Sequence, residues 1–83
     1  MPEVSISQAK KLKIPKHSLQ TILISKQISK KDAIKWLKEN NLRYDYYRTT
    51  INNMRFMQIN PIEGANFYTK KINPYINFVY QEY

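Results

Sequence analysis

The stretch that decides the fold is residues 29–59, SKKDAIKWLKENNLRYDYYRTTINNMRFMQI. Its first part carries an apolar stripe with the spacing of a helix, formed by Ala33, Ile34, Trp36 and Leu37. Ser29 followed by Asp32 matches a capping box in which Asp replaces the usual Glu or Gln. Asn40-Asn41 suits the end of a helix. The sequence therefore predicts a helix over residues 30–40.

The second part of this stretch changes to a period of two, which is typical of strands. Residues 44–51 and 54–59 predict two antiparallel strands joined by a two-residue turn at Asn52-Asn53. Symmetric pairing across that turn would place position 48 opposite position 57 and position 50 opposite position 55. Arg48 and Arg55 would then be diagonal neighbours on one face of the hairpin.

Three further strands are predicted at residues 19–25, 67–72 and 76–80, which are rich in β-branched and aromatic residues. The apolar run Ile22-Leu23-Ile24 indicates a central place in the sheet for the first of them. The predicted fold class is therefore α+β, a small and mostly antiparallel sheet with one helix packed on one face. The elements follow the order β-α-β-β-β-β, and we assign residues 18–83 to this single domain.

Residues 1–17 are expected to form a basic N-terminal arm or lead-in to the domain. Within them, one or two helical turns could start from a cap at Ser7, and Pro15 would end them. A domain this small needs its large aromatic side chains in the core, which we predict for Trp36, Phe56, Phe67 and Phe78. Packing, rather than base stacking, is the expected role of Tyr47, Tyr68 and Tyr80.

The composition excludes several classes of protein. The 83 residues contain no Cys and a single His, His17, which argues against disulfides, zinc–thiolate sites and paired-histidine chemistry. The carboxylates are scattered, so we expect no enzyme activity, no cofactor and no metal. No apolar run approaches the roughly 18 residues of a membrane span, and the first residues lack a signal-peptide core. We therefore expect an intracellular protein that is not secreted.

The formal net charge of +8 points to an anionic partner. Many residues have AT-rich codons, so genome composition accounts for part of the Lys content. The charge is nevertheless uneven, because residues 1–31 carry +6 and residues 32–83 only +2. Arg is disfavoured by the same bias, which makes the three arginines the more informative cations.

These arginines, Arg43, Arg48 and Arg55, fall in one hairpin region and alternate with tyrosines such as Tyr46. Cationic side chains neutralise phosphates, and tyrosines stack on bases or bind phosphates. The further nucleic-acid-binding candidates are Lys70 and Lys71 on a strand and Lys31, Lys35 and Lys38 along the helix. Alternatives stay open for each: Arg55 over Tyr47 or Trp36 as a structural cation–π contact, Asp45 paired with Arg43 or Arg48, and a merely solvated helix face.

Four segments carry a likeness to other proteins: KDAIKWLK from Lys31, MRFMQ from Met54 with Pro61 behind it, FYTKKI from Phe67 and INFVY from Ile76. In these segments the chain resembles a loose group of small proteins from giant viruses, virophages and phages. The shared pattern is an aromatic-Arg-Phe-x-Gln strand, here with Met54 at the aromatic position. The resemblance implies DNA binding and puts Arg55, Gln58, Lys70 and Lys71 at the polar positions of the pattern.

The expected function is therefore that of a small basic nucleic-acid-binding protein of viral or mobile-element origin. DNA fits better than RNA, and phosphate contacts with weak sequence preference are expected. We expect it in the host cytoplasm, a viral factory or the virion. The alternative is a protein–protein interaction module, either a homodimer or a binder of a host factor.

Overall fold

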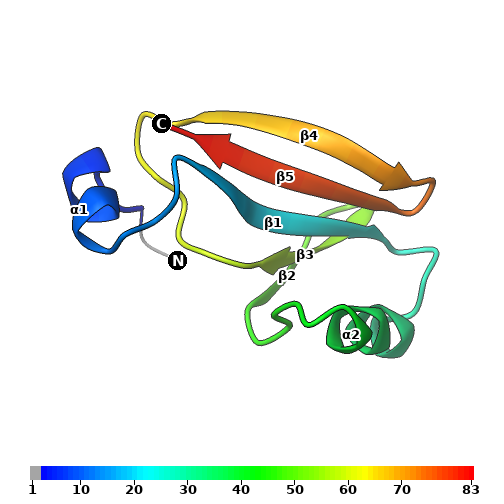
Figure 1. The fold of residues 1–83 in the computed structure, drawn as a ribbon. Coiled ribbons are helices and arrows are strands. Elements are labelled where there is room, and N and C mark those ends of the chain that lie inside the picture. Colours follow the sequence, from blue (N-terminus) through cyan, green and yellow to red (C-terminus); the bar gives the residue numbers. More distant parts are fainter. Residues whose placement is uncertain (1–2) are drawn as a thin grey trace.

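The structure, a computed structural model, describes residues 3–83; the first two residues of the predicted arm lie outside this range. The described residues form one five-stranded antiparallel sheet and two helices (Figure 1). The elements are α1 (Ile6–Lys11), β1 (His17–Ser25), α2 (Lys30–Glu39), β2 (Tyr47–Thr49), β3 (Asn53–Met57), β4 (Asn66–Asn73) and β5 (Ile76–Glu82). The strand order is β2-β3-β1-β5-β4. The α+β class is confirmed, and α1 is an addition to the predicted order.

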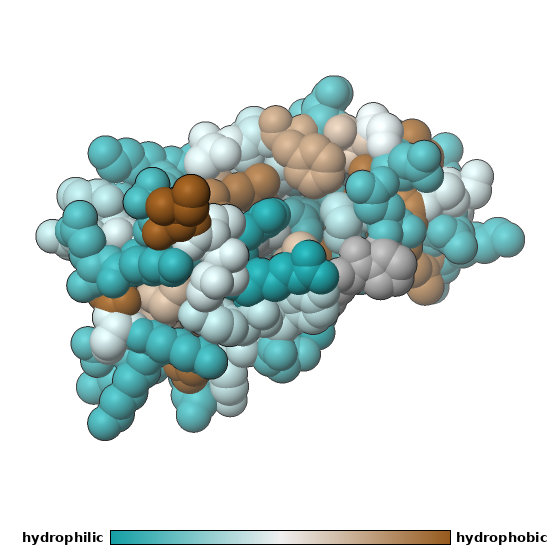
Figure 2. All heavy atoms as spheres, turned by 180° about the vertical axis from the view of Figure 1, so that it is seen from behind, coloured by the Kyte–Doolittle hydropathy of each residue, from teal (hydrophilic) through white to brown (hydrophobic). Residues whose placement is uncertain are grey.

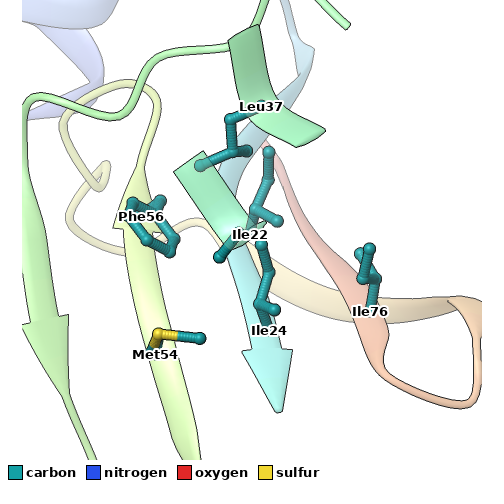
Figure 3. Close-up of a cluster of buried hydrophobic side chains, with 7 residues drawn as sticks. Ile22, Ile24, Leu37, Met54, Phe56 and Ile76 are labelled. Atoms are coloured by element: carbon teal, nitrogen blue, oxygen red, sulfur yellow. The ribbon is translucent and has the colours of Figure 1, made fainter. Parts of the chain in front are cut away.

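One face of the sheet is covered by α2, as the helical period predicts. Ser29 caps α2 by accepting a hydrogen bond from the Asp32 N–H at 3.2 Å. Leu37 faces Ile22 of β1 and Phe56 of β3 (Figure 3), and all three side chains are fully buried. The core cluster on this face consists of Ile22, Ile24, Ala33, Leu37, Met54, Phe56 and Ile76. The central position predicted for the apolar run in β1 is confirmed.

The opposite side of the sheet, here called the distal face, follows from the strand registers because successive side chains alternate between faces. It carries Arg48 of β2, Arg55 and Met57 of β3, Thr21 and Leu23 of β1, Asn77, Val79 and Gln81 of β5, and Phe67, Thr69 and Lys71 of β4. At one end the distal face is covered, since the fully buried Gln81 accepts a hydrogen bond from the Ile62 N–H of the loop before β4.

The N-terminal helix α1 lies beyond that end of the sheet (Figure 1). Its capping residue is Ser5, which forms a complete capping box with Gln8, so the prediction of a cap at Ser7 was wrong. Ala9 is fully buried in a second small cluster with Val4 and Ile62. The helix therefore docks onto the loop before β4 through a short apolar contact.

The turn between β2 and β3 differs from its prediction by one residue. The Thr50 N–H donates to the Asn53 carbonyl at 2.8 Å, and the Thr50 hydroxyl accepts from the Asn53 N–H. Ile51 and Asn52 therefore occupy the tip, where Ile51 is 91% exposed, and the predicted turn at Asn52-Asn53 was wrong. The shift changes the pairing of the hairpin, so that position 48 faces position 55 directly.

Phe67 is the one predicted core aromatic that lies outside the core. It is 48% exposed on β4, an edge strand with a neighbour on only one side. Phe56 is fully buried, and Trp36 and Phe78 are partly buried against the main cluster. An edge position explains the difference, because fewer neighbouring side chains surround a residue there.

Candidate nucleic-acid interface

Arg48 and Arg55 form a directly opposed pair across β2 and β3 on the distal face. Residues in this position have Cα atoms about 4.5–5.5 Å apart, and their side chains lie on the same side. Within the described chain neither arginine has a carboxylate within 4.0 Å, since the two ion pairs there are His17–Glu82 and Arg43–Asp45. The predicted diagonal arrangement was wrong, and the actual one brings the two charges closer.

The polar surroundings of this pair are sparse. An Arg48 Nη2–H donates to the Tyr46 hydroxyl at 3.1 Å, and the guanidinium carbon lies 5.6 Å from the centre of that ring. The Arg55 Nε is buried and has no hydrogen-bond acceptor among the described residues. Arg55 makes no structural cation–π contact with Tyr47, which lies on the α2 side and carries Lys30 Nζ at 4.1 Å instead. The pair therefore has few hydrogen-bond acceptors within the described chain, and the buried Nε of Arg55 is closed to an external one.

Arg43 is placed differently, because its charge is already neutralised. Its guanidinium donates to both Asp45 carboxylate oxygens at 3.0 and 2.9 Å and to the Gln58 carbonyl at 2.9 Å. The hydrogen bond from Arg43 holds the pKa of Asp45 below its usual value, and the same bond raises the pKa of Arg43. The buried Gln58 side chain also bonds the Arg43 backbone in both directions. Arg43 thus fastens the loop before β2 to the end of β3.

Lys70 and Lys71 lie on opposite faces of the sheet. Lys71 of β4 pairs with Asn77 of β5, and Asn77 pairs with Leu23 of β1. Leu23 pairs in turn with Arg55 of β3, which is opposite Arg48 of β2. We call this line of five the cross-sheet row, namely Arg48, Arg55, Leu23, Asn77 and Lys71. Lys70 instead pairs with Phe78 and belongs to the α2 side. The structure therefore joins one of the two lysines to the arginine pair.

The helix lysines form a separate surface. Lys31, Lys35 and Lys38 line an open groove of about 780 Å³ along α2, together with Lys30, Asp32 and Ile34. This groove lies on the side of the sheet away from the arginine pair, because α2 packs on the face that carries Ile22 and Phe56. Lys38 Nζ also lies 5.2 Å from the centre of the Tyr44 ring. The predicted site residues are thus divided between two faces of the molecule.

A chain of ring contacts on the α2 side was not found from the sequence. It runs from Trp36 through Phe78, Tyr80 and Tyr68 to His17, with neighbouring centroids 5.4–6.3 Å apart. Tyr68 and Tyr80 are stacked at 5.4 Å, and His17 Nε2 lies 3.2 Å from Glu82. The strand registers bring these residues together, and no local sequence motif predicts these contacts.

Seen from behind, the molecule shows hydrophilic side chains over most of this surface, with hydrophobic ones in separate places (Figure 2). Within residues 3–83, no helix is long and apolar enough to span a bilayer, and no three His, Asp or Glu side chains are grouped to hold a metal ion.

No family model, no curated protein and no solved structure matches this chain.

Proposed function

We propose that this chain is a small nucleic-acid-binding protein of viral or mobile-element origin that grips the phosphate backbone of DNA. The observation that carries the proposal is the direct opposition of Arg48 and Arg55 without a neighbouring carboxylate. Like charges directly opposite each other destabilise a sheet. A phosphate placed between them relieves the repulsion and accepts charge-assisted, bidentate hydrogen bonds from guanidinium groups.

Two further features support a polyanion over a single small anion. The cross-sheet row continues from the arginine pair to Lys71, so cations stand at both ends of one line on the distal face. The net charge of +8, concentrated in residues 1–31, adds long-range attraction. Both features suit a ligand with repeating phosphates.

Contacts through helix α2 would give weak sequence preference. Helix α2 has no Arg, Asn or Gln, the residues that read base edges best from a helix. The resemblance to small viral proteins favours DNA over RNA.

The test is a salt-titrated anisotropy measurement with labelled DNA. Contacts with about five phosphates predict that log K falls with log salt at a slope of about −4 to −5. Reversing both charges in R48E/R55E should lower affinity at least tenfold and make the slope shallower. The matched control is K10E/K11E, which makes the same change of net charge at two exposed positions of α1. Equal losses in the two variants would contradict a defined site.

A second candidate function is self-association through the edge of β4. This strand has eight residues, seven of them exposed, and it has a partner on one side only. Antiparallel pairing with a second copy about Thr69 would place Tyr68 opposite Lys70 and Phe67 opposite Lys71 of that copy, which are cation–π partners.

Light scattering separates this second candidate from a monomer. T69K would place two like charges opposite each other at the centre of such a dimer and should dissociate it. T49K is the matched control, since Thr49 is an exposed residue of the other edge strand, β2. A monomeric wild-type protein at high concentration would exclude this mode of association.

A further inference from the structure

Phe67 stands apart from the other large aromatic side chains of the sheet. Its side chain is 48% exposed, and it takes part in no ring–ring contact among the described residues. The neighbouring Tyr68 has similar exposure, 43%, but it is stacked on Tyr80 and touched by His17. An exposed apolar ring without a partner has a free face for a ligand.

Phe67 also lies on the same face as the cations. It pairs with Gln81 and alternates with Thr69 and Lys71 along β4, so it belongs to the distal face. The four-residue step from Phe67 to Lys71 is about 13 Å along the strand. The three strand intervals from Arg55 to Lys71 add up to about 14 Å across the sheet. A ring and cations at these separations fall within reach of a few linked nucleotides.

The side chains between these groups carry no charge. Leu23 and Asn77 separate Arg55 from Lys71 in the cross-sheet row, and Thr69 and Val79 lie between that row and Phe67. Sugars and bases could therefore lie over these uncharged residues, between Arg55 and Lys71. In a duplex the faces of the bases are covered by their neighbours, whereas unpaired bases stack readily on aromatic side chains.

We propose that the distal face binds single-stranded nucleic acid, with phosphates at Arg48, Arg55 and Lys71 and one base stacked on Phe67. This inference rests on the proposed nucleic-acid-binding function and specifies its ligand. The two edge strands bound the site, because Arg48 lies on β2 and Phe67 on β4. The strand of nucleic acid therefore crosses the sheet rather than following the groove along α2.

The test compares F67A with Y68A, two neighbouring ring deletions on opposite faces of one strand. The probes are a single-stranded oligonucleotide of about 12 nucleotides, the matching duplex, and an abasic oligomer of the same length. F67A should lower affinity for the single strand at least about fivefold, as expected for loss of base stacking. Y68A should change it less than about twofold, and neither variant should alter binding of the abasic oligomer, which has phosphates but no bases.

A second set of variants tests the charges in the same way, with the neighbouring Lys70 and Lys71. K71E should weaken binding of both the single strand and the abasic oligomer, whereas K70E, with the same change of net charge, should weaken it much less. Equal losses for F67A and Y68A, or tighter binding of the duplex than of the single strand, would overturn the stacking inference. Those results would not contradict the phosphate-binding proposal. That proposal fails if R48E/R55E binds the abasic oligomer as tightly as the unaltered protein does, or if it loses no more affinity than K10E/K11E.

Discussion

The two faces of the sheet are built from the same strands and differ in almost every physical respect. On the α2 side, alternate residues such as Ile22, Ile24 and Phe56 are fully buried and pack against Leu37. On the distal face, the residues between them include Arg55, which is directly opposite Arg48 without a carboxylate partner. The α2 side thus holds the main core, and the distal face carries a pair of like charges on β2 and β3, so substitutions at Phe56 and Arg48 should have opposite consequences.

The largest effect is expected at Phe56, in the middle of the covered face. F56A removes a fully buried ring and should lower the free energy of unfolding by about 3–5 kcal/mol, measured by urea denaturation. R55A, one residue away on the distal face, is the control and should cost far less. Similar losses of unfolding free energy in F56A and R55A would contradict the difference between the two faces of the sheet at these positions.

The covered face was the part of the fold that the sequence could predict, because its signals are local. The helical spacing from Ala33 to Leu37 and the alternation from Met54 to Met57 each state which residues share a side. The start of helix α1 was predicted at a Ser7 cap and lies at Ser5, since both serines are plausible capping residues in isolation. The choice between them depends on Gln8, which completes the capping box with Ser5.

The distal face was predicted less well because it depends on contacts between distant segments. Arg48 and Arg55 were chosen correctly as hairpin neighbours, but a one-residue error in the turn gave the wrong pairing. Arg43 could not be separated from them by sequence, since Asp45 lies close to both Arg43 and Arg48 along the chain and either pairing was open. Lys70 and Lys71 were grouped as one candidate, although the period of a strand sends adjacent side chains to opposite faces.

The second-largest effect is expected where the distal face is covered. Gln81 accepts a hydrogen bond from the Ile62 N–H at 2.9 Å and donates to the Asn60 carbonyl at 3.2 Å. Q81L leaves those buried backbone groups without a partner and should cost about 1–3 kcal/mol of unfolding free energy. S18A loses only a 3.4 Å contact with Gln81 and serves as the control. A harmless Q81L would mean that α1 and its loop do not seal this end of the sheet.

A smaller effect of opposite sign is expected at the arginine pair. R48T removes one of two opposed charges and introduces a good strand former, so it should raise stability by about 0.2–1 kcal/mol at low salt. Added salt screens the repulsion and should shrink the gain. K10Q, which removes one exposed charge outside the pair, controls for net charge. An equal gain in K10Q would indicate general repulsion within a chain of charge +8, and not a local conflict between Arg48 and Arg55.

The smallest effect is expected at the arginine whose charge is already satisfied. The pKa of Asp45 is lowered in the folded state, chiefly by the hydrogen bond from Arg43, so the pair stabilises the protein above the unfolded pKa of about 3.9. That contribution disappears as the pH falls through the lower folded value. D45N should therefore be slightly less stable than the unaltered protein at neutral pH, and the difference should begin to shrink below about pH 4 and vanish below the lowered folded pKa.

Urea unfolding of both proteins over this pH range measures the difference, with D32N as a control whose carboxylate has no ion pair in the described chain. Because the Asp45 side chain is exposed, a large or pH-independent loss in D45N would mean that the carboxylate holds the loop before β2 by more than its bond to Arg43. A small loss of unfolding free energy in D45N that disappears in acid would support the difference between Arg43 and the other two arginines. Arg43 is held by Asp45 and Gln58, whereas Arg48 and Arg55 have no carboxylate partner in the described chain, which is the arrangement that the proposed phosphate contact uses.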